Sequence, residues 1–213
     1  MKKLLVMGLI STMIVGTMVG CSSKSTSSTA ATGKKKQVVV ISKSFQNQFY
    51  QAAFKGAMDA GKEFNVDVTT NGPDAESNIP QQVDQVAAAI NKKPDAIVLA
   101  ACDPQSLNET LKKAKDAKIP VIGFDSGVPG DKTGAVVATA ATDNTTAGGF
   151  VAKNLFGDKD FQQKVLKGTT EKPTIIGILA QDATSGSIVL RTNGFIAEMV
   201  KNLETLDGLK GAV

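Results

Sequence analysis

The chain has 213 residues, with 24 basic and 20 acidic side chains and a formal net charge of +4. It contains no histidine, which excludes the usual general base near neutral pH, the serine and cysteine triads that depend on it, and the commonest zinc ligand. Carboxylate and lysine chemistry stay formally open, but the composition favours a protein that is not an enzyme and has neither metal nor cofactor.

The first twenty residues, MKKLLVMGLISTMIVGTMVG, combine two lysines with an apolar run from Leu4 to Val19. This layout is typical of a secretory signal peptide, so we leave residues 1–20 out of the fold. A membrane-spanning helix is disfavoured, because the run is short and is followed by small and polar residues instead of basic ones. Without the two signal lysines, 22 basic residues face 20 acidic ones, so the charge indicates neither nucleic acid nor a strongly acidic ligand.

A cysteine follows directly, and the MVGC of residues 18–21 resembles the lipobox of bacterial lipoproteins. The resemblance implies that Cys21 carries a lipid that attaches the protein to a membrane. The alternative is an ordinary signal peptide with a chance cysteine. Residues 21–36 have no large apolar side chain after the cysteine and are predicted to be a flexible tether. With Cys21 lipidated, Cys102 has no disulfide partner, so an apolar core must stabilise the body.

Short β-branched runs alternate with amphipathic helical segments from residue 37 onward. Continuous apolar strands between helices indicate a parallel sheet that is covered on both faces. Right-handed crossovers then give an α/β, Rossmann-like, doubly wound layer. The expected strands are residues 37–42, 66–70, 96–101, 120–125 and 135–141, and the expected helices are residues 48–64, 79–92 and 104–117.

Fewer elements are expected in the part that follows. They are two helices and one strand, over residues 145–156, 185–203 and 174–179. A lone strand has no ladder partner, so either this strand joins the first sheet or the chain lacks the C-terminal part of a second lobe. We predict an N-terminal lobe over residues 37–143 and a partial C-terminal lobe over residues 144–213.

Ligands of open parallel sheets bind beyond the carboxyl ends of the strands, so the polar residues that follow each strand are candidates for a site. No glycine-rich phosphate loop follows the first strand, since SKSFQNQ matches neither GxGxxG nor GxxxxGKS. An uncharged polyol suits these side chains better than a nucleotide, because a sugar ring stacks on aromatic residues while its hydroxyls bond amides and carboxylates. The candidates are Lys43, Ser44, Asn47, Phe49, Tyr50, Cys102, Asp103, Asp125, Ser126, Asp143 and Asn144.

Most of these candidates also have a purely structural interpretation. Asp125, in FDSG, could be a turn residue. Others could cap a helix, namely Asn47, Asp103, Asp143 and Asn144. Others again could belong to the core, namely Phe45, Phe49, Phe54 and Cys102.

Several motifs occur in order: FQNQFY after the first strand, IPVIGFDSGVP at the fourth, and VATAATDNTTAGGFVAKNL thereafter. Together with the signal and the tether they resemble the substrate-binding lipoproteins of ABC importers, in particular the ribose- and galactose-binding group of type 1 periplasmic binding proteins. The resemblance covers residues 37 to about 200. It implies two Rossmann-like lobes that close on a monosaccharide or similar polyol, an ABC transporter permease as partner, and a monomer. Chains of this family continue beyond residue 213, so the second lobe is expected to be incomplete.

The resemblance also implies roles for individual residues. Asn47, Phe49 and Tyr50 match the asparagine and the two aromatic residues that bond and sandwich the sugar ring. Asp125 matches the carboxylate that accepts sugar hydroxyls, and Arg191 matches an arginine of the second lobe that reaches into the cleft.

Ser126 stands where the ribose-binding type has an arginine, which leaves a furanosyl signalling molecule, a nucleoside or a cyclitol open as ligands. A secreted enzyme with Asp125 and a lysine as acid and base is disfavoured by the missing histidine and by the lack of a close carboxylate pair. A DNA-binding regulator is disfavoured by the export signal. We predict a lipid-anchored protein of the cell envelope, outside the cytoplasmic membrane, that binds a sugar and delivers it to an importer.

Overall fold

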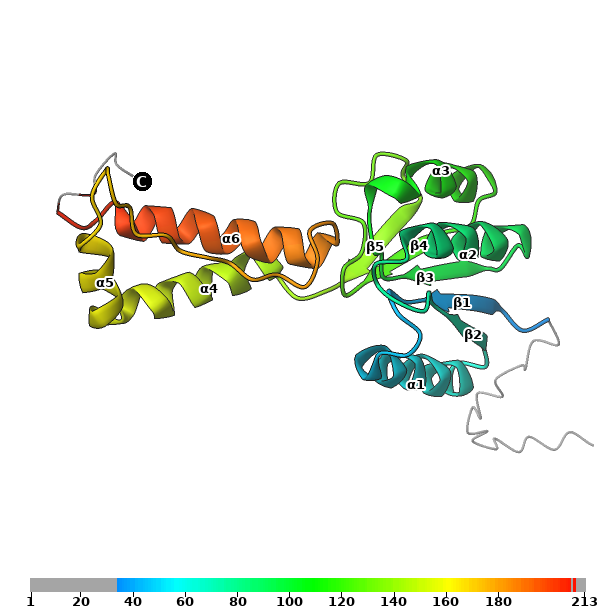
Figure 1. Cartoon of the computed structure of the whole chain (residues 1–213). Helices are drawn as coiled ribbons and strands as arrows, with labels where there is room; N and C mark the ends of the chain where they lie inside the picture. The colour runs from blue at the N-terminus through cyan, green and yellow to red at the C-terminus, as the bar shows by residue number, and fades with distance from the viewer. Residues whose placement is uncertain (1–33, 208, 210–213) are drawn as a thin grey trace, which may run out of the picture. The chain divides into compact units, whose positions relative to one another are not determined.

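A five-stranded parallel sheet forms the first part of the protein (Figure 1). The computed structural model describes residues 34–207 and 209, so the predicted signal peptide, Cys21 and the tether up to residue 33 lie outside the described residues. The strand order is β2-β1-β3-β4-β5, and every neighbouring pair is parallel. The strands are β1 (Gln37–Ile41), β2 (Asp67–Asn71), β3 (Ala96–Leu99), β4 (Val121–Phe124) and β5 (Val136–Ala140). The predicted α/β class and these five strands are confirmed.

Helices cover both faces of this sheet, with α1 on one face and α2 and α3 on the other (Figure 1). Successive residues of a strand point to opposite faces, so Val40 packs with Phe54 of α1 while Ile41 packs with Val86 of α2. Burial on both faces explains why the strands read as continuous apolar runs. The helices are α1 (Gln48–Glu63), α2 (Ile79–Asn91) and α3 (Asn108–Asp116), and a 3-10 turn, η1 (Gln105–Leu107), precedes α3.

Polar side chains fix where the helices begin. Asn47 and Asp103 each accept a hydrogen bond of 2.9 Å from the amide two residues ahead, and Asp143 accepts one of 3.0 Å from the amide three residues ahead. The capping roles predicted for Asn47 and Asp143 are therefore confirmed. The prediction that Asp103 caps the α-helix is wrong, because Asp103 bonds an amide of the 3-10 turn and α3 begins four residues later than the predicted residue 104.

Three helices make up most of the remaining described chain: α4 (Asn144–Gly157), α5 (Lys159–Leu166) and α6 (Gly186–Leu203). Helices α4 and α6 lie side by side (Figure 1). Their approach depends on glycine, because a Cβ at Gly148 would lie 2.0 Å from the Arg191 carbonyl oxygen and one at Gly194 would lie 2.1 Å from the Thr145 carbonyl oxygen. A small apolar core joins the three helices through Ala152, Val165, Met199 and Leu203.

The strand predicted over residues 174–179 is wrong. Residues 173–180 form no ladder with any described strand, although the segment is apolar and β-branched. Its side chains find no sheet to pack on, and Ile175 is 86% exposed. A strand needs a partner as well as propensity, and the segment does not join the first sheet.

Helix α5 was not predicted, because residues 157–173 read as a polar stretch. Asp158 caps it by accepting hydrogen bonds from the amides of Asp160 and Phe161. Its apolar residues Phe161 and Val165 are four positions apart and pack on the helical core. An acidic cap followed by an i, i+4 apolar pair is the signal that could have identified it.

The predicted boundary after residue 143 falls between β5 and α4, and the division into two lobes stays a prediction. We refer to residues 34–143 as the sheet region and to residues 144–207 as the helical region. None of the described helices is both long enough and apolar enough to cross a bilayer.

We predict that Gly148→Ala destabilises the protein even though alanine is the better helix former. The new methyl group would overlap the Arg191 carbonyl, so α4 and α6 must separate, and the free energy of unfolding should fall by about 1–3 kcal/mol. Gly149→Ala is the matched control, because its Cβ would meet nothing closer than 3.7 Å; it should be neutral or stabilising by up to ~1 kcal/mol. Urea unfolding followed by circular dichroism measures both. Equal stabilities would contradict the packing.

Candidate functional site

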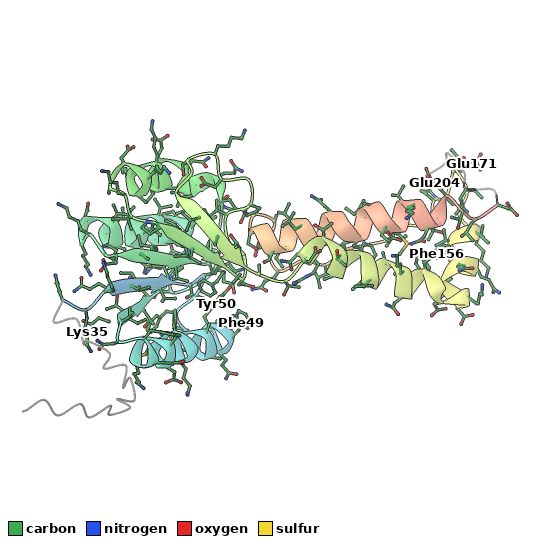
Figure 2. All side chains as sticks on the ribbon, turned by 180° about the vertical axis from the view of Figure 1, so that it is seen from behind. Lys35, Phe49, Tyr50, Phe156, Glu171 and Glu204 are labelled. Carbon is green, nitrogen blue, oxygen red and sulfur yellow. The ribbon has the colours of Figure 1, made fainter. Side chains whose placement is uncertain are left out.

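Tyr50 and Asp125 form a hydrogen-bonded pair at the carboxyl end of the sheet. The Tyr50 hydroxyl donates to Asp125 Oδ2 at 2.8 Å. Tyr50 and Phe49 lie in the first turn of α1 (Figure 2), and Asp125 directly follows β4. Because the carboxyl ends of parallel strands share one edge of the sheet, these residues meet although they are 75 positions apart.

The ring of Tyr50 belongs to the core, and only its hydroxyl is engaged in a polar contact. The residue is 2% exposed, and its ring meets Phe124 edge-on at 6.3 Å between centroids. Burial raises the pKa of the phenol far above its ordinary value, and the neighbouring Asp125 charge and hydrogen bond raise it further. The phenol therefore stays protonated at neutral pH and serves as a fixed donor to Asp125.

Asp125 has a left-handed backbone, with φ at +54°. Aspartate tolerates this region better than most residues, and the turn closes when the Gly127 amide donates to the Phe124 carbonyl at 3.0 Å. The turn role of Asp125 is confirmed. The same turn holds its half-buried carboxylate against Tyr50, and contact with a ligand stays a prediction.

Phe49 and Tyr50 differ in exposure, although the family resemblance implies that both rings sandwich the sugar. Phe49 is 60% exposed and meets Tyr50 edge-on, with centroids 5.0 Å apart. Its ring face is open to a stacking partner, whereas the Tyr50 ring is covered. Phe54 is buried as expected, but Phe45 is 37% exposed beside it, so the expectation that Phe45 is core holds only in part.

Asn47 uses both ends of its amide. Its oxygen caps α1, and its nitrogen donates to Glu76 Oε1 at 3.3 Å. Glu76 lies in the loop between β2 and α2, and its other carboxylate oxygen, Oε2, is buried and lies 2.8 Å from the Lys43 ammonium nitrogen. Lys43 is therefore the charge partner of this oxygen.

Ser126 and Arg191 have partners of their own. The Ser126 hydroxyl is buried and lies 3.0 Å from that of Ser187 and 3.3 Å from Asp125 Oδ2. Arg191 donates to Asn144 Oδ1 at the start of α4. The structure therefore brings Asn47, Tyr50, Asp125 and Ser126 to one edge of the sheet, whereas Arg191 has no hydrogen bond to any of them among the described residues.

Lys43 is a buried cation for which the sequence predicted no specific role, although its position after β1 made it one of the polar candidates. It is 4% exposed, and its Nζ atom lies 2.8 Å from Glu76 Oε2, 3.7 Å from Asp182 Oδ2 and 3.3 Å from Ser185 Oγ. The 2.8 Å approach makes the Lys43 ammonium the charge partner of the buried Glu76 Oε2 atom. The position of Lys43, two residues after the apolar strand β1, is the sequence feature that could have identified it as a site residue.

Cys102 is a buried structural residue, as predicted. It is 2% exposed, and its Sγ lies 3.5 Å from the Lys43 carbonyl oxygen. Burial raises the pKa of the Cys102 thiol to about 12, while the positive charge of Lys43 opposes part of the rise. Its own carbonyl accepts a hydrogen bond of 3.1 Å from the Thr184 hydroxyl, which ties the end of β3 to the loop before α6.

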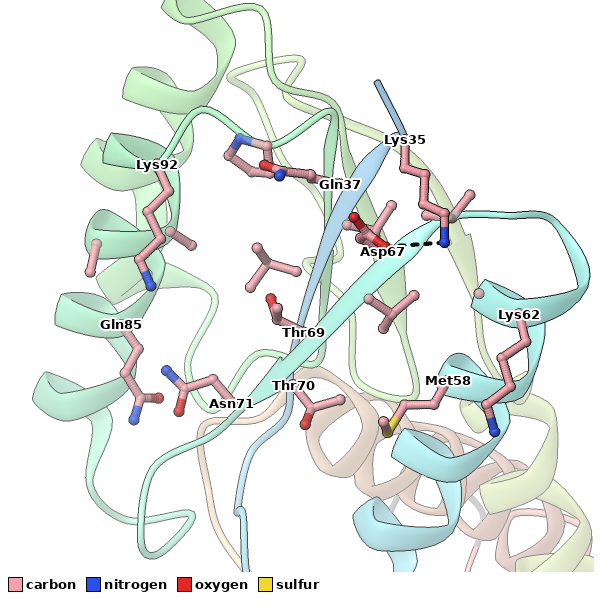
Figure 3. A pocket seen from close by; sticks show the side chains of 18 residues that line it. Lys35, Gln37, Met58, Lys62, Asp67, Thr69, Thr70, Asn71, Gln85 and Lys92 are labelled. Carbon is pink, nitrogen blue, oxygen red and sulfur yellow. Dashed lines mark ion pairs between the residues drawn. The ribbon is translucent and has the colours of Figure 1, made fainter. Parts of the chain in front are cut away.

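A separate hollow of about 710 Å³ runs along β2, the edge strand, between α1 and α2. Figure 3 shows Lys35, Lys62 and Lys92 around it, with an ion pair of 3.7 Å between Lys35 and Asp67. None of Asn47, Tyr50, Asp125 and Ser126 lines it. Lysines around an exposed edge strand are a common protection against strand pairing, so the hollow follows from the sheet edge and we assign no ligand to it.

Among the described residues, no group of three or more acidic, cysteine or histidine side chains could hold a metal ion.

Comparison with known proteins agrees with this geometry. The periplasmic binding protein domain family matches residues 38–212. The chain belongs to this family. Among curated relatives of this periplasmic binding protein, the D-ribose/D-allose-binding protein of Pseudomonas aeruginosa is 31% identical over 99 residues, which cover 46% of the chain and 31% of the relative.

Solved structures of the family extend the similarity. A solute binding protein of an ABC transporter from Agrobacterium vitis, solved with bound D-fucose, is 35% identical with a TM-score of 0.64, over 78% of this chain and 54% of that one. A Brachyspira murdochii protein, described as an ABC transporter, LacI family transcriptional regulator, is 34% identical with a TM-score of 0.67, over 80% and 52% of the two chains. The chain thus spans about half the length of these solved relatives.

We predict that Cys102 does not react with thiol reagents in the folded protein. Relative to the ordinary value of 9.0, a pKa of about 12 lowers the thiolate fraction at pH 8 on the order of a thousandfold, and burial further blocks access. In a Cys21→Ser background, labelling by DTNB should be negligible at pH 8 and complete in urea. The Cys21→Ser/Cys102→Ser variant gives the blank. Rapid labelling of the folded protein would contradict the burial.

Proposed function

We propose that the protein binds a sugar between the sheet region and the helical region and delivers it to an ABC importer without covalent chemistry. The observation that carries the proposal is the set of buried or half-buried polar groups at the carboxyl edge, formed by Asn47, Tyr50, Asp125 and Glu76. This is the position where ligands of open parallel sheets bind. Family membership and the D-fucose complex of a relative that is 35% identical support the same ligand class.

Each residue at the edge has a role that suits a sugar. The exposed ring of Phe49 would stack on the apolar face of the sugar, while Asp125 and Glu76 would accept hydrogen bonds from its hydroxyls. Asn47 would add an amide, and Ser126 a small hydroxyl. Tyr50 acts indirectly, because its hydroxyl holds Asp125 in place and its ring is buried.

The two regions would act as two lobes. Asn144 and Arg191 in the helical region are bonded to each other at the start of α4, and Arg191 would turn toward the ligand when the lobes close on it. Contacts that exist only in the closed state favour that state when the sugar is present. This gives a monomeric binding protein that presents its closed form to a permease.

The proposed location rests on the sequence. A signal peptide over residues 1–20 and a lipid on Cys21 would place the protein in the cell envelope, outside the cytoplasmic membrane, with residues 22–36 as tether. All but the last three of these residues lie outside the described structure, so their role rests on sequence alone.

A panel of sugars in a thermal-shift assay, followed by calorimetry of the best ones, tests the proposal on this chain. We predict a rise in melting temperature with at least one neutral monosaccharide at millimolar concentration, since a ligand that binds only the folded state stabilises it. Nucleosides and cyclitols belong in the same panel, and stabilisation by one of them alone would replace the sugar. No stabilisation by any compound would overturn the proposal for this chain.

Asp125→Asn should weaken the affinity for the best sugar by roughly 10- to 100-fold, because a charge-assisted hydrogen bond contributes about 1.5–3 kcal/mol. Asp84→Asn is the matched control, since Asp84 is exposed on α2 and the same change there should leave the affinity unaltered. The melting temperature without sugar shows whether either variant is damaged in its fold. An Asp125→Asn protein that binds as well as the wild type would exclude Asp125 from the site.

A further inference from the structure

Lys43 joins the two regions through a single buried ammonium group. The lysine belongs to the sheet region and is 4% exposed. One partner, Glu76, also belongs to the sheet region, whereas Asp182 and Ser185 come from the loop that leads into α6. The Lys43 ammonium therefore lies between a carboxylate of the sheet region, Glu76, and one of the helical region, Asp182.

Asp182 is held in place for this contact by its own loop. Its Oδ1 atom accepts hydrogen bonds from the amides of Thr184 and Ser185 at 3.0 and 2.8 Å, and its Oδ2 atom accepts one of 2.9 Å from the Ser185 hydroxyl. Burial works to raise the pKa of Asp182, but these hydrogen bonds outweigh it and hold the pKa below its ordinary value. The carboxylate is thus charged and oriented before it meets the lysine.

The same loop fits closely on the sheet region around the ammonium. The Thr184 hydroxyl donates to the Cys102 carbonyl at 3.1 Å, and the hydroxyls of Ser187 and Ser126 lie 3.0 Å apart. A Cβ at Gly186 would lie 2.7 Å from the Pro129 ring and 2.9 Å from the Ser126 carbonyl oxygen. Through these neutral contacts the loop packs on the sheet region. The Lys43–Asp182 pair is the only ion pair between the two regions among the described residues.

The alternative is that Lys43 serves only the internal stability of the sheet region. Glu76 alone would neutralise its charge for that purpose. A second carboxylate gives the cluster a net charge of −1, which costs desolvation energy without stabilising the sheet. Because this second carboxylate, Asp182, belongs to the helical region, its attraction to Lys43 depends on how the two regions are placed relative to each other.

We propose that Lys43, Glu76 and Asp182 form an ionic clasp that holds the loop of residues 182–187 against the sheet region and so stabilises the closed arrangement. The effect on ligand affinity rests on the proposed function, whereas the effect on the placement of the regions does not. A clasp of this kind acts on the equilibrium between open and closed forms, and the affinity for any ligand that needs the closed form scales with the closed fraction.

Lys43→Met tests the clasp. It leaves Glu76 and Asp182 facing each other without a cation, so affinity should fall by the same factor for every sugar that binds, roughly tenfold or more. The matched control is Lys36→Met, which removes a lysine whose side chain is 73% exposed and pairs with Asp95 at 2.7 Å; it should leave every affinity unchanged. A loss that differs from sugar to sugar would show that Lys43 acts at the ligand, either directly or through Glu76, and would overturn the clasp.

A second readout needs no sugar. Spin labels at Lys112→Cys in α3 and Gln163→Cys in α5, both exposed positions, report the distance between the two regions in a background with Cys21 and Cys102 changed to serine. Lys43→Met should broaden or lengthen the distance distribution, and Lys36→Met should not. An unchanged distribution in Lys43→Met would overturn the clasp even if its melting temperature falls.

The two proposals fail in different ways. If no compound binds the wild type, the proposed function fails while the label distances still decide on the clasp. If sugars bind and Lys43→Met changes neither affinity nor distance, only the clasp fails. Should Lys43→Met not fold, Asp182→Asn keeps the Lys43–Glu76 pair and removes only the charge across the gap, so the same affinities and distances apply.

Discussion

The parallel register of β1 with both of its neighbours is the constraint on which the rest of the structure depends. Ile41 at the end of β1 pairs with Asn71 of β2 on one side and Leu99 of β3 on the other, so these three strands end at one line. Helices cover both faces of the sheet, which leaves the strand ends as the place where polar side chains can gather beside the core. Lys43 follows β1 at this edge. Strand β4 pairs Gly123 with Leu99 of β3, which brings Asp125 to the same edge, where it meets Tyr50.

The sheet was predictable because its signal is local. Strands β1, β3 and β4 carry continuous apolar runs, and β2 is a short β-branched segment between helices. Polar caps such as Asn47 and Asp143 mark where the helices begin, so short windows of sequence were sufficient. The segment of residues 174–179 has the same local signal and forms no strand, since pairing depends on a neighbour that no window contains. Helix α5 was missed because its local signal is weak. Only two of its apolar residues, Phe161 and Val165, pack on the core.

The candidate site was predictable only in part. Asp125 directly follows β4, and Asn47 lies in the short connection between β1 and α1. Their positions in the sequence were enough to include both among the candidates. The burial of Tyr50 and the exposure of Phe49 could not be distinguished, because adjacent aromatic residues on a helix read alike until the sheet is in place. Glu76 and Asp182 lie in loops without periodicity, so nothing local connects them with Lys43, and only the folded chain shows that the three charges meet.

A ligand site at these edge residues, as proposed, would combine a fixed half with an adjustable one. Asp125 is fixed by a turn and by the Tyr50 hydroxyl, and this half of the site is set when the sheet forms. Ser187 and Arg191 sit on or near the start of α6, and their position follows any movement of the helical region. Specificity would then reside mainly in the sheet region, while the helical region contributes to residence time through the rate of opening.

The unpaired segment TIIGIL has a consequence for handling the protein. It has no charge and no proline, is rich in β-branched residues, and keeps Ile175 86% exposed. Segments of this kind template intermolecular β-structure, because identical copies can stack in register with every backbone group satisfied. These six residues are therefore a candidate site of aggregation outside the carboxyl edge, and a single lysine placed among them would act as a gatekeeper.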